Sequence, residues 1–174
     1  DRIHLKRRRT KSEDGPRYTR MDFKEERLEV RERDLRFWVN LDDFLDTGLY
    51  SDHRNTRVIV RELAPGKDFL NLYAYTAAFS CAAAAGGAKT TVSVDRSAAY
   101  LNWARDNLEL NGLMGRQHTL VQSDAEKYLA QAYKEGRRFS LAFVDPPSFF
   151  QARDSGVSFD INRGHPELIK SVLK

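Results

Sequence analysis

Acidic residues follow three of the four apolar segments that we predict to be parallel β-strands. Asp95, Asp124 and Asp145 each stand at or next to the end of such a segment. In open α/β sheets ligands bind beyond the carboxyl ends of the strands. Carboxylates there accept hydrogen bonds from hydroxyl groups and from the N–H groups of amines and heterocyclic rings. The spacing therefore predicts one ligand site lined by carboxylates.

Asp95 is the candidate for binding a sugar. In nucleoside-binding α/β folds a carboxylate after the second strand accepts hydrogen bonds from ribose hydroxyls. The alternative is that Asp95 only caps the next helix, but Ser97 is the better capping residue. The first loop, residues 75–80, reads YTAAFS and lacks the glycines that admit a pyrophosphate. We therefore expect a nucleoside without phosphates, with its ribose on Asp95.

The sequence predicts two alternative roles for Asp124 and favours neither. Its carboxylate accepts a hydrogen bond either from an exocyclic amine such as that of adenine or from the first turn of the next helix.

The most specific motif is Asp145-Pro146-Pro147-Ser148-Phe149. Two prolines after a strand remove two donors and force a rigid, extended turn, whose carbonyl groups we expect to point outward unpaired. A carboxylate, backbone acceptors and an aromatic ring together suit a flat heterocycle. The alternative is a simple strand end followed by a core phenylalanine.

The single cysteine and the histidines carry no predicted chemistry. Cys81 lies among alanines, so a structural role is expected, no intrachain disulfide can form, and a reducing cytoplasm is the expected compartment. His53 lies in a polar stretch and His118 at a strand start, and neither has a second ligand at metal spacing. We expect no metal site.

The elements that position these residues alternate regularly after Gly66. Strands are predicted over residues 68–73, 90–94, 118–122 and 140–144, and helices over residues 78–85, 97–110, 125–134 and 166–174. Mainly apolar strands between helices indicate a parallel sheet covered on both faces, an α/β fold. Upstream, residues 28–31 and 35–40 predict a hairpin, and residues 56–63 a helix.

The charge is uneven along the chain. The net charge is +4, yet the first 20 residues carry eight Lys and Arg against three acids. The remaining residues are near neutral. Such an arm fits phosphate binding, with a solvated terminus as the alternative. No apolar segment is long enough to span a membrane, so no membrane partner is expected.

Several motifs together resemble S-adenosylmethionine-dependent RNA methyltransferases. They are residues 71–76 (NLYAYT), 94–95 (VD), 107–112 (NLELNG) and 145–149 (DPPSF), with 37–41 (FWVNL) and 46–54 (DTGLYSDHR) upstream. Within that family they are most similar to the guanine-N7 half of the bifunctional bacterial enzymes that act on 23S ribosomal RNA. The similarity covers roughly residues 28–150.

The resemblance implies a class I methyltransferase fold, S-adenosylmethionine as cofactor and 23S ribosomal RNA as partner. It also implies the residues of each subsite. Around the methionine part of the cofactor we expect Asp52, Arg54, Asn71, Tyr73, Tyr75, Thr76 and Ala77. On the ribose and adenine we expect Asp95, Arg96, Ser123, Asp124 and Ala125. On the target base we expect Asp145, Pro146, Pro147, Ser148 and Phe149.

The implied reaction fits the residue types present. Guanine N7 carries a lone pair at neutral pH. Alignment of N7 with the methyl donor is therefore enough for its methylation, and no general base is needed. A pyrimidine-C5 enzyme needs a cysteine near Asp145, and none is there. Methylation of an exocyclic amine is an alternative.

One position departs from the family pattern. The family loop usually has glycine where this chain has Ala77. If that position needs a positive φ, alanine costs about 1 kcal/mol. A second alternative is therefore an RNA-binding module that keeps the fold without turnover.

The expected organisation has three parts. Residues 1–22 form a basic arm, residues 23–66 a small β-rich extension with a connecting helix, and residues 67–174 the cofactor-binding domain. Class I sheets usually have about seven strands, so four parallel strands predict a domain that lacks its last strands. The family also predicts a fused or neighbouring second methyltransferase domain.

Overall fold

The computed structural model describes residues 24, 26–43, 46–151 and 158–174, so the basic arm predicted over residues 1–22 lies outside the described part. The strands are β1 (Leu28–Glu32), β2 (Leu35–Val39), β3 (Asp68–Leu72), β4 (Thr90–Asp95), β5 (His118–Gln122), β6 (Leu141–Val144), β7 (Phe149–Gln151) and β8 (Ser158–Asp160). The helices are the short 3-10 turn η1 (Ser51–His53) and α1 (Arg54–Leu63), α2 (Ala78–Ala85), α3 (Ala98–Leu110), α4 (Ala125–Lys134) and α5 (Ile161–Val172).

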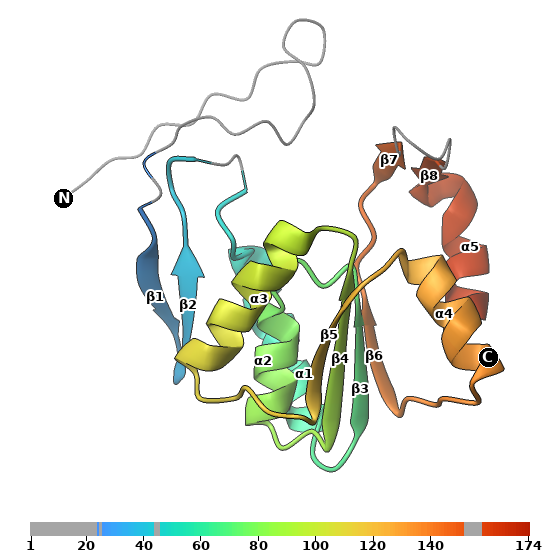
Figure 1. Cartoon of the computed structure of the whole chain (residues 1–174), viewed down its shortest axis with the longest axis horizontal. Helices are drawn as coiled ribbons and strands as arrows, with labels where there is room; N and C mark the ends of the chain where they lie inside the picture. The colour runs from blue at the N-terminus through green and yellow to red at the C-terminus, as the bar shows by residue number, and fades with distance from the viewer. Residues whose placement is uncertain (1–23, 25, 44–45, 152–157) are drawn as a thin grey trace, which may run out of the picture.

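The four predicted strands form one parallel sheet, in the order β5-β4-β3-β6. Leu70 pairs with Val92 of β4 and with Ala142 of β6, so β3 lies at the centre. Helices cover both faces, with α1, α2 and α3 on one side and α4 and α5 on the other (Figure 1). The predicted α/β fold with a doubly covered parallel sheet is confirmed.

Alternation along the strands divides the core between the two faces. Leu70, Leu72, Val92 and Val94 pack on α4 and α5. Phe69 of β3 points the other way and packs against α1 and α2. Since neighbouring side chains of a strand point to opposite faces, this double covering explains why the strands are mainly apolar.

The predicted hairpin is the pair β1–β2, which joins through a tight turn where Arg33 has a φ of 58°. One face of β2, with Leu35 and Phe37, is buried against α2 and Leu108 of α3. This extension therefore packs on the parallel sheet's own helices. Its boundary at residue 66 stays a prediction.

The edge of β2 that faces away from β1 is paired by side chains of α3. The Asn111 side chain accepts from Arg36 N at 2.8 Å and donates to Arg36 O at 2.6 Å. One turn earlier Asn107 accepts from Trp38 N at 2.9 Å, and one turn before that Trp103 Nε1 donates to Trp38 O at 2.9 Å. A spacing of four residues places these three side chains on one helix face. They supply the partners that a third strand would otherwise give.

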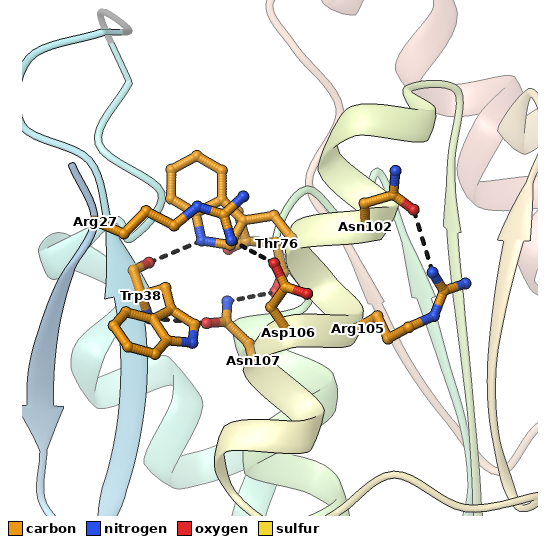
Figure 2. A network of polar contacts seen from close by, with 8 residues as sticks. Arg27, Trp38, Thr76, Asn102, Arg105, Asp106 and Asn107 are labelled. Carbon is orange, nitrogen blue, oxygen red and sulfur yellow. Dashed lines mark hydrogen bonds and ion pairs between the residues drawn. The ribbon is translucent and has the colours of Figure 1, made fainter. Parts of the chain in front are cut away.

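Asn107 also reaches the loop after β3. Its Nδ2 donates to Thr76 O at 3.0 Å, and the Thr76 hydroxyl donates to Gly48 O at 2.6 Å. Figure 2 shows Asn107 between Trp38 and Thr76. One buried amide thus joins the hairpin, α3 and the loop at the end of the central strand.

A buried ion pair fixes the hairpin to α1. Arg57 donates from Nε and Nη2 to the two carboxylate oxygens of Glu32, each at 2.7 Å. Its Nη2 also donates to Tyr50 O at 2.9 Å. Because both charged groups are buried and hydrogen-bonded, the pair sets the position of the segment before α1.

The loop after β3 is strained. Tyr73, Tyr75 and Ala77 have φ values of 57°, 50° and 57°. Left-handed backbone is unfavourable for residues with a Cβ. Ala77 therefore has the positive φ that the family glycine suggested, and it leads directly into α2.

Three expectations about elements need correction. The helix predicted from residue 56 begins at Arg54, because η1 runs straight into it. The helix predicted from Pro166 begins at Ile161, where the Asp160 side chain accepts from Asn162 N at 2.9 Å. Strands β7 and β8 were not predicted, since their residues carry no clear alternation.

Replacing Ala77 with glycine is expected to raise the free energy of unfolding by about 0.5–1 kcal/mol, because glycine adopts a positive φ without the Cβ clash. Chemical denaturation measures it. Ala74 is a matched control in the same loop, since it is also buried and is not among the positive-φ residues. Ala74→Gly is expected to destabilise. Equal effects of the two changes would contradict the strain argument.

Replacing Asn107 with leucine is expected to lower the free energy of unfolding by about 2–4 kcal/mol, because Trp38 N and Thr76 O lose their partners in a buried place. Thermal and urea unfolding measure the change. Asn102→Leu is the control on the same helix, since the Asn102 side chain makes only an exposed contact with Arg105. A loss at Asn107 no larger than that at Asn102 would show that the amide does not join the three elements.

Candidate active site

A cavity of about 670 Å³ opens at the carboxyl ends of the parallel strands. Its volume lies within the range of roughly 300–1,000 Å³ typical of small-molecule sites. The predicted residues that line it are Asn71, Tyr73, Tyr75, Thr76, Asp95, Arg96, Ser123, Ala125, Asp145, Pro146, Pro147 and Ser148. The sequence therefore identified most of one wall, spread over four strand ends.

Asp95 is held rigidly at the cavity. Its Oδ2 accepts from Tyr75 N at 2.9 Å and its Oδ1 from Ser97 N at 2.8 Å. Burial raises the pKa of Asp95, and these backbone hydrogen bonds oppose that shift. The helix cap proper is Ser97, which accepts from Tyr100 N. Each carboxylate oxygen has a second lone pair, so Asp95 can still accept from a ligand hydroxyl.

Asp124 caps α4. Its Oδ1 accepts from Glu126 N at 3.0 Å and from Lys127 N at 3.2 Å. Its Oδ2 lies 3.9 Å from Arg96 Nη1. Of the two readings left open for Asp124, the structure shows capping, and Asp124 is not among the residues that line the cavity.

Aromatic rings form a second wall, of which the sequence predicted Tyr73 and Tyr75 but not Tyr50 and Tyr100. Tyr75 packs against Tyr50 at 5.4 Å and Tyr100 at 4.6 Å between ring centroids. Burial raises the pKa of Tyr75 far above its ordinary value, so its phenol stays neutral. Burial, and then the charge of Asp124, raises the pKa of Tyr73 to about 12. This wall is aromatic and uncharged.

Gly48 permits the close approach of this region to α3. A Cβ at Gly48 would lie 2.3 Å from the Trp103 ring, and its φ of 98° also favours glycine. Gly48 and Tyr50 belong to the stretch upstream of η1 that the sequence motif included. Only the folded chain shows that they line the same cavity as Asp95.

Buried polar side chains lie beneath the loop. Asn71 Nδ2 donates to Ser80 Oγ at 3.0 Å, and Ser80 Oγ lies 2.7 Å from Ser93 Oγ. Asn71 is 1% exposed but lines the cavity. The three side chains join β3, α2 and β4, and so fix the floor of the cavity.

The turn at residues 145–148 forms the end wall with a histidine that the sequence did not single out. His53 Nε2 lies 3.4 Å from Asp145 Oδ2. Ser148 O accepts from Ile161 N at 3.1 Å, so the expectation that the carbonyls of this turn are all unpaired is wrong at Ser148. The reason is that α5 begins against the turn.

Some predicted site residues lie elsewhere. Asp52 and Arg54 are exposed and do not line the cavity, whereas His53 between them does. Ala77 is fully buried behind the cavity wall. Phe149 begins β7, and its side chain lies outside the described part.

Cys81 and His118 are structural, as expected. Cys81 is buried in the helix core, and burial raises the pKa of its thiol to about 12. His118 Nδ1 lies 3.0 Å from Thr91 Oγ1 in a buried contact. Among the described residues no group of His, Cys, Asp and Glu could hold a metal ion. No described helix has the length and apolar character needed to cross a membrane.

Comparison with known proteins agrees with this geometry. Residues 7–170 match the family model of S-adenosylmethionine-dependent methyltransferases. "Ribosomal RNA large subunit methyltransferase K" of Neisseria meningitidis serogroup B is 50% identical over 145 residues, 83% of this chain. "Ribosomal RNA large subunit methyltransferase K/L" of Aeromonas salmonicida is 46% identical over 166 residues, 95% of this chain. The chain spans 41% and 23% of the lengths of these relatives.

The fold also matches a solved methyltransferase, SMU.776, whose structure contains S-adenosylhomocysteine. The TM-score is 0.80 at 33% identity, over 87% of this chain and 40% of that one. The resemblance and the cofactor predicted from the motifs are both confirmed. The chain belongs to the S-adenosylmethionine-dependent methyltransferase family.

Proposed function

We propose that this chain transfers a methyl group from S-adenosylmethionine to N7 of a guanine in 23S ribosomal RNA, in the cytoplasm. The observation that carries the proposal is one cavity with two ends. Asp95 ends β4 and the Asp145-Pro146-Pro147-Ser148 turn follows β6, so the two line the cavity from opposite sides of β3. The 50% identity to a large-subunit ribosomal RNA methyltransferase supports the RNA substrate.

The cavity residues fit the cofactor's chemical groups. When bound, S-adenosylmethionine supplies an electrophilic methyl group on a positively charged sulfur. Asp95 suits the ribose hydroxyls, because both of its oxygens are fixed by backbone N–H groups and each keeps a free lone pair. We assign Asn71, Tyr73, Tyr75 and Thr76 to the methionine end and Arg96, Ser123 and Ala125 to the adenine end. Roles for Asp52, Arg54 and Asp124 in binding stay predictions.

Methylation at guanine N7 needs alignment of N7 with the methyl group rather than a general base. N7 has a lone pair, its bond to the methyl carbon forms as the sulfur–carbon bond breaks, and no proton leaves. The positive charge moves onto the guanine ring. Asp145 accepts from the N–H groups of that ring, and its negative charge stabilises the ring as it becomes positive.

The rest of the end wall holds the base. Pro146 and Pro147 make the turn rigid, and the neighbouring cavity walls are aromatic. A base in folded RNA reaches such a pocket only when it is unpaired or flipped out of its stack. A stacking role for Phe149 stays a prediction.

Two alternatives have specific support. An acidic residue before two prolines also suits methylation of an exocyclic amine, so the modified atom must be identified. The left-handed Ala77 favours a module that binds RNA without turnover, because strain in the cofactor loop works against cofactor binding. Calorimetry with S-adenosylmethionine distinguishes that module from an enzyme.

A second methyltransferase domain, fused or neighbouring, is a further part of this proposal. Its support is that the chain spans only 41% and 23% of the lengths of these two relatives.

Incubating the protein with isotope-labelled S-adenosylmethionine and unmodified 23S ribosomal RNA is expected to yield labelled 7-methylguanosine, identified by mass spectrometry of the digested RNA. Asp145→Ala is expected to reduce the rate at least tenfold, because the carboxylate that orients the base is lost. Label in a methylated exocyclic amine would replace the N7 assignment. Tight cofactor binding without any label in the RNA would favour the non-catalytic module.

Replacing Asp95 with alanine is expected to weaken S-adenosylmethionine binding by about 1–3 kcal/mol, through lost charge-assisted hydrogen bonds. Isothermal titration calorimetry measures this change. Asp124→Asn is the matched control, because asparagine keeps a capping oxygen at the start of α4. Unchanged affinity in Asp95→Ala would leave Asp95 with a purely structural role. Weakened affinity in Asp124→Asn would give Asp124 a role at the adenine.

A further inference from the structure

The mechanism above does not use His53, although it stands beside the carboxylate at the end of the cavity. The 3.4 Å between His53 Nε2 and Asp145 Oδ2 exceeds the roughly 2.7–3.2 Å of a good N–H···O hydrogen bond. The side chains are 30% and 49% exposed. Both groups line the cavity, so a ligand there meets them together.

The imidazole is held by aromatic packing. Its ring stands edge-on to Phe79, with centroids 5.6 Å apart, and to Phe143, at 5.9 Å. Phe79 and Phe143 are themselves stacked at 3.5 Å. The guanidinium of Arg57, which is fixed by Glu32, lies 5.6 Å from the Phe79 ring centre. His53 therefore has a defined place rather than a freely moving side chain.

The pair presents one acceptor and one donor side by side. An ionised carboxylate only accepts hydrogen bonds, while an imidazole that carries its proton on Nε2 donates from that atom. With its proton on Nε2, the imidazole presents that donor 3.4 Å from Asp145 Oδ2. A ligand edge that matches the pair has an N–H next to an acceptor oxygen.

Only some bases have such an edge. Guanine and uracil carry a keto oxygen beside a ring N–H, whereas adenine and cytosine carry an amino group beside a ring nitrogen that accepts. Guanine adds its 2-amino group, which can donate to the other oxygen of Asp145. Enzymes that flip a base read it by hydrogen bonds to this edge.

We propose that His53 determines base specificity: its Nε2 donates to the keto oxygen while Asp145 accepts from the adjacent N–H. This inference rests on the proposed function, in that the end of the cavity takes the target base. It adds the basis on which guanine is chosen over adenine and cytosine. A mismatched base would leave a donor facing a donor and an acceptor facing an acceptor.

The test uses the four ribonucleoside monophosphates, GMP, UMP, AMP and CMP, as probes. Each is titrated into the full chain saturated with S-adenosylhomocysteine, and binding is followed by NMR at millimolar nucleotide. GMP is expected to bind on the order of tenfold more tightly than AMP or CMP, the discrimination expected of a paired donor and acceptor. UMP, which lacks the 2-amino group, is expected between them.

Variants test whether His53 and Asp145 cause the preference for GMP over AMP. His53→Leu is expected to lower the GMP-to-AMP ratio, because the donor to the keto oxygen is lost while Asp145 still accepts from the ring N–H. His53→Gln keeps an N–H donor and is expected to restore part of the ratio. Asp145→Asn can donate as well as accept, so it is expected to raise AMP affinity relative to GMP. His165→Leu, an exposed histidine on α5, is the control. Affinity for S-adenosylhomocysteine checks the fold of each variant.

Three outcomes would overturn the proposal. They are equal affinity of the wild type for GMP and AMP, no binding of any of the four nucleotides, and an unchanged ratio in His53→Leu. The outcome of this nucleotide-binding test is independent of the ribosomal RNA methylation assay. Loss of 7-methylguanosine formation with the GMP preference intact would refute the proposed reaction alone, and label at N7 without a nucleotide preference would refute the role of His53 alone.

Discussion

The position of the hairpin against the parallel sheet's helices, and with it the loop after β3, is set by how the free edge of β2 is hydrogen-bonded. A two-stranded hairpin leaves backbone N–H and C=O groups unpaired on both outer edges, and such edges need partners when they are buried. Trp103, Asn107 and Asn111 of α3 supply them on one edge of β2. Because Asn107 also bonds Thr76 O, the same contact that attaches the hairpin holds the loop at the end of β3.

The loop after β3 has a strained backbone, and it also lines the cavity. Three positive φ values between residues 73 and 77 turn the chain sharply from the central strand into α2. The strain is held by Asp95, which accepts from Tyr75 N, and by the Asn107–Thr76–Gly48 hydrogen bonds. Strained backbone persists where its surroundings fix it, and it gathers at functional sites. The hydrogen bonds that stabilise this loop therefore also shape the cavity that it lines.

The two ends of the cavity are built differently. The Asp95 end is made by backbone groups and one carboxylate, within the parallel sheet's own loops. The Asp145 end combines a proline-stiffened turn after β6 with His53, which arrives from the segment before α1. The Glu32–Arg57 ion pair fixes that segment, and Arg57 also bonds Tyr50 O. The small hairpin thus contributes to the Asp145 side of the cavity although it lies outside the parallel sheet.

Sequence patterns alone predicted the parallel sheet, the order of its strands and helices along the chain, and the carboxylates at the strand ends. Those signals are local: apolar runs, a Ser97 cap and prolines after Val144 act within a few residues. Only the tertiary structure decided that Asp124 caps α4, that Tyr50 and Tyr100 wall the cavity, and that His53 meets Asp145. The cap at Asp124 is local, and the structure only selected it over a ligand contact. The contacts of Tyr50 and Tyr100 with Tyr75, and of His53 with Asp145, join residues far apart in the chain, and packing sets their geometry.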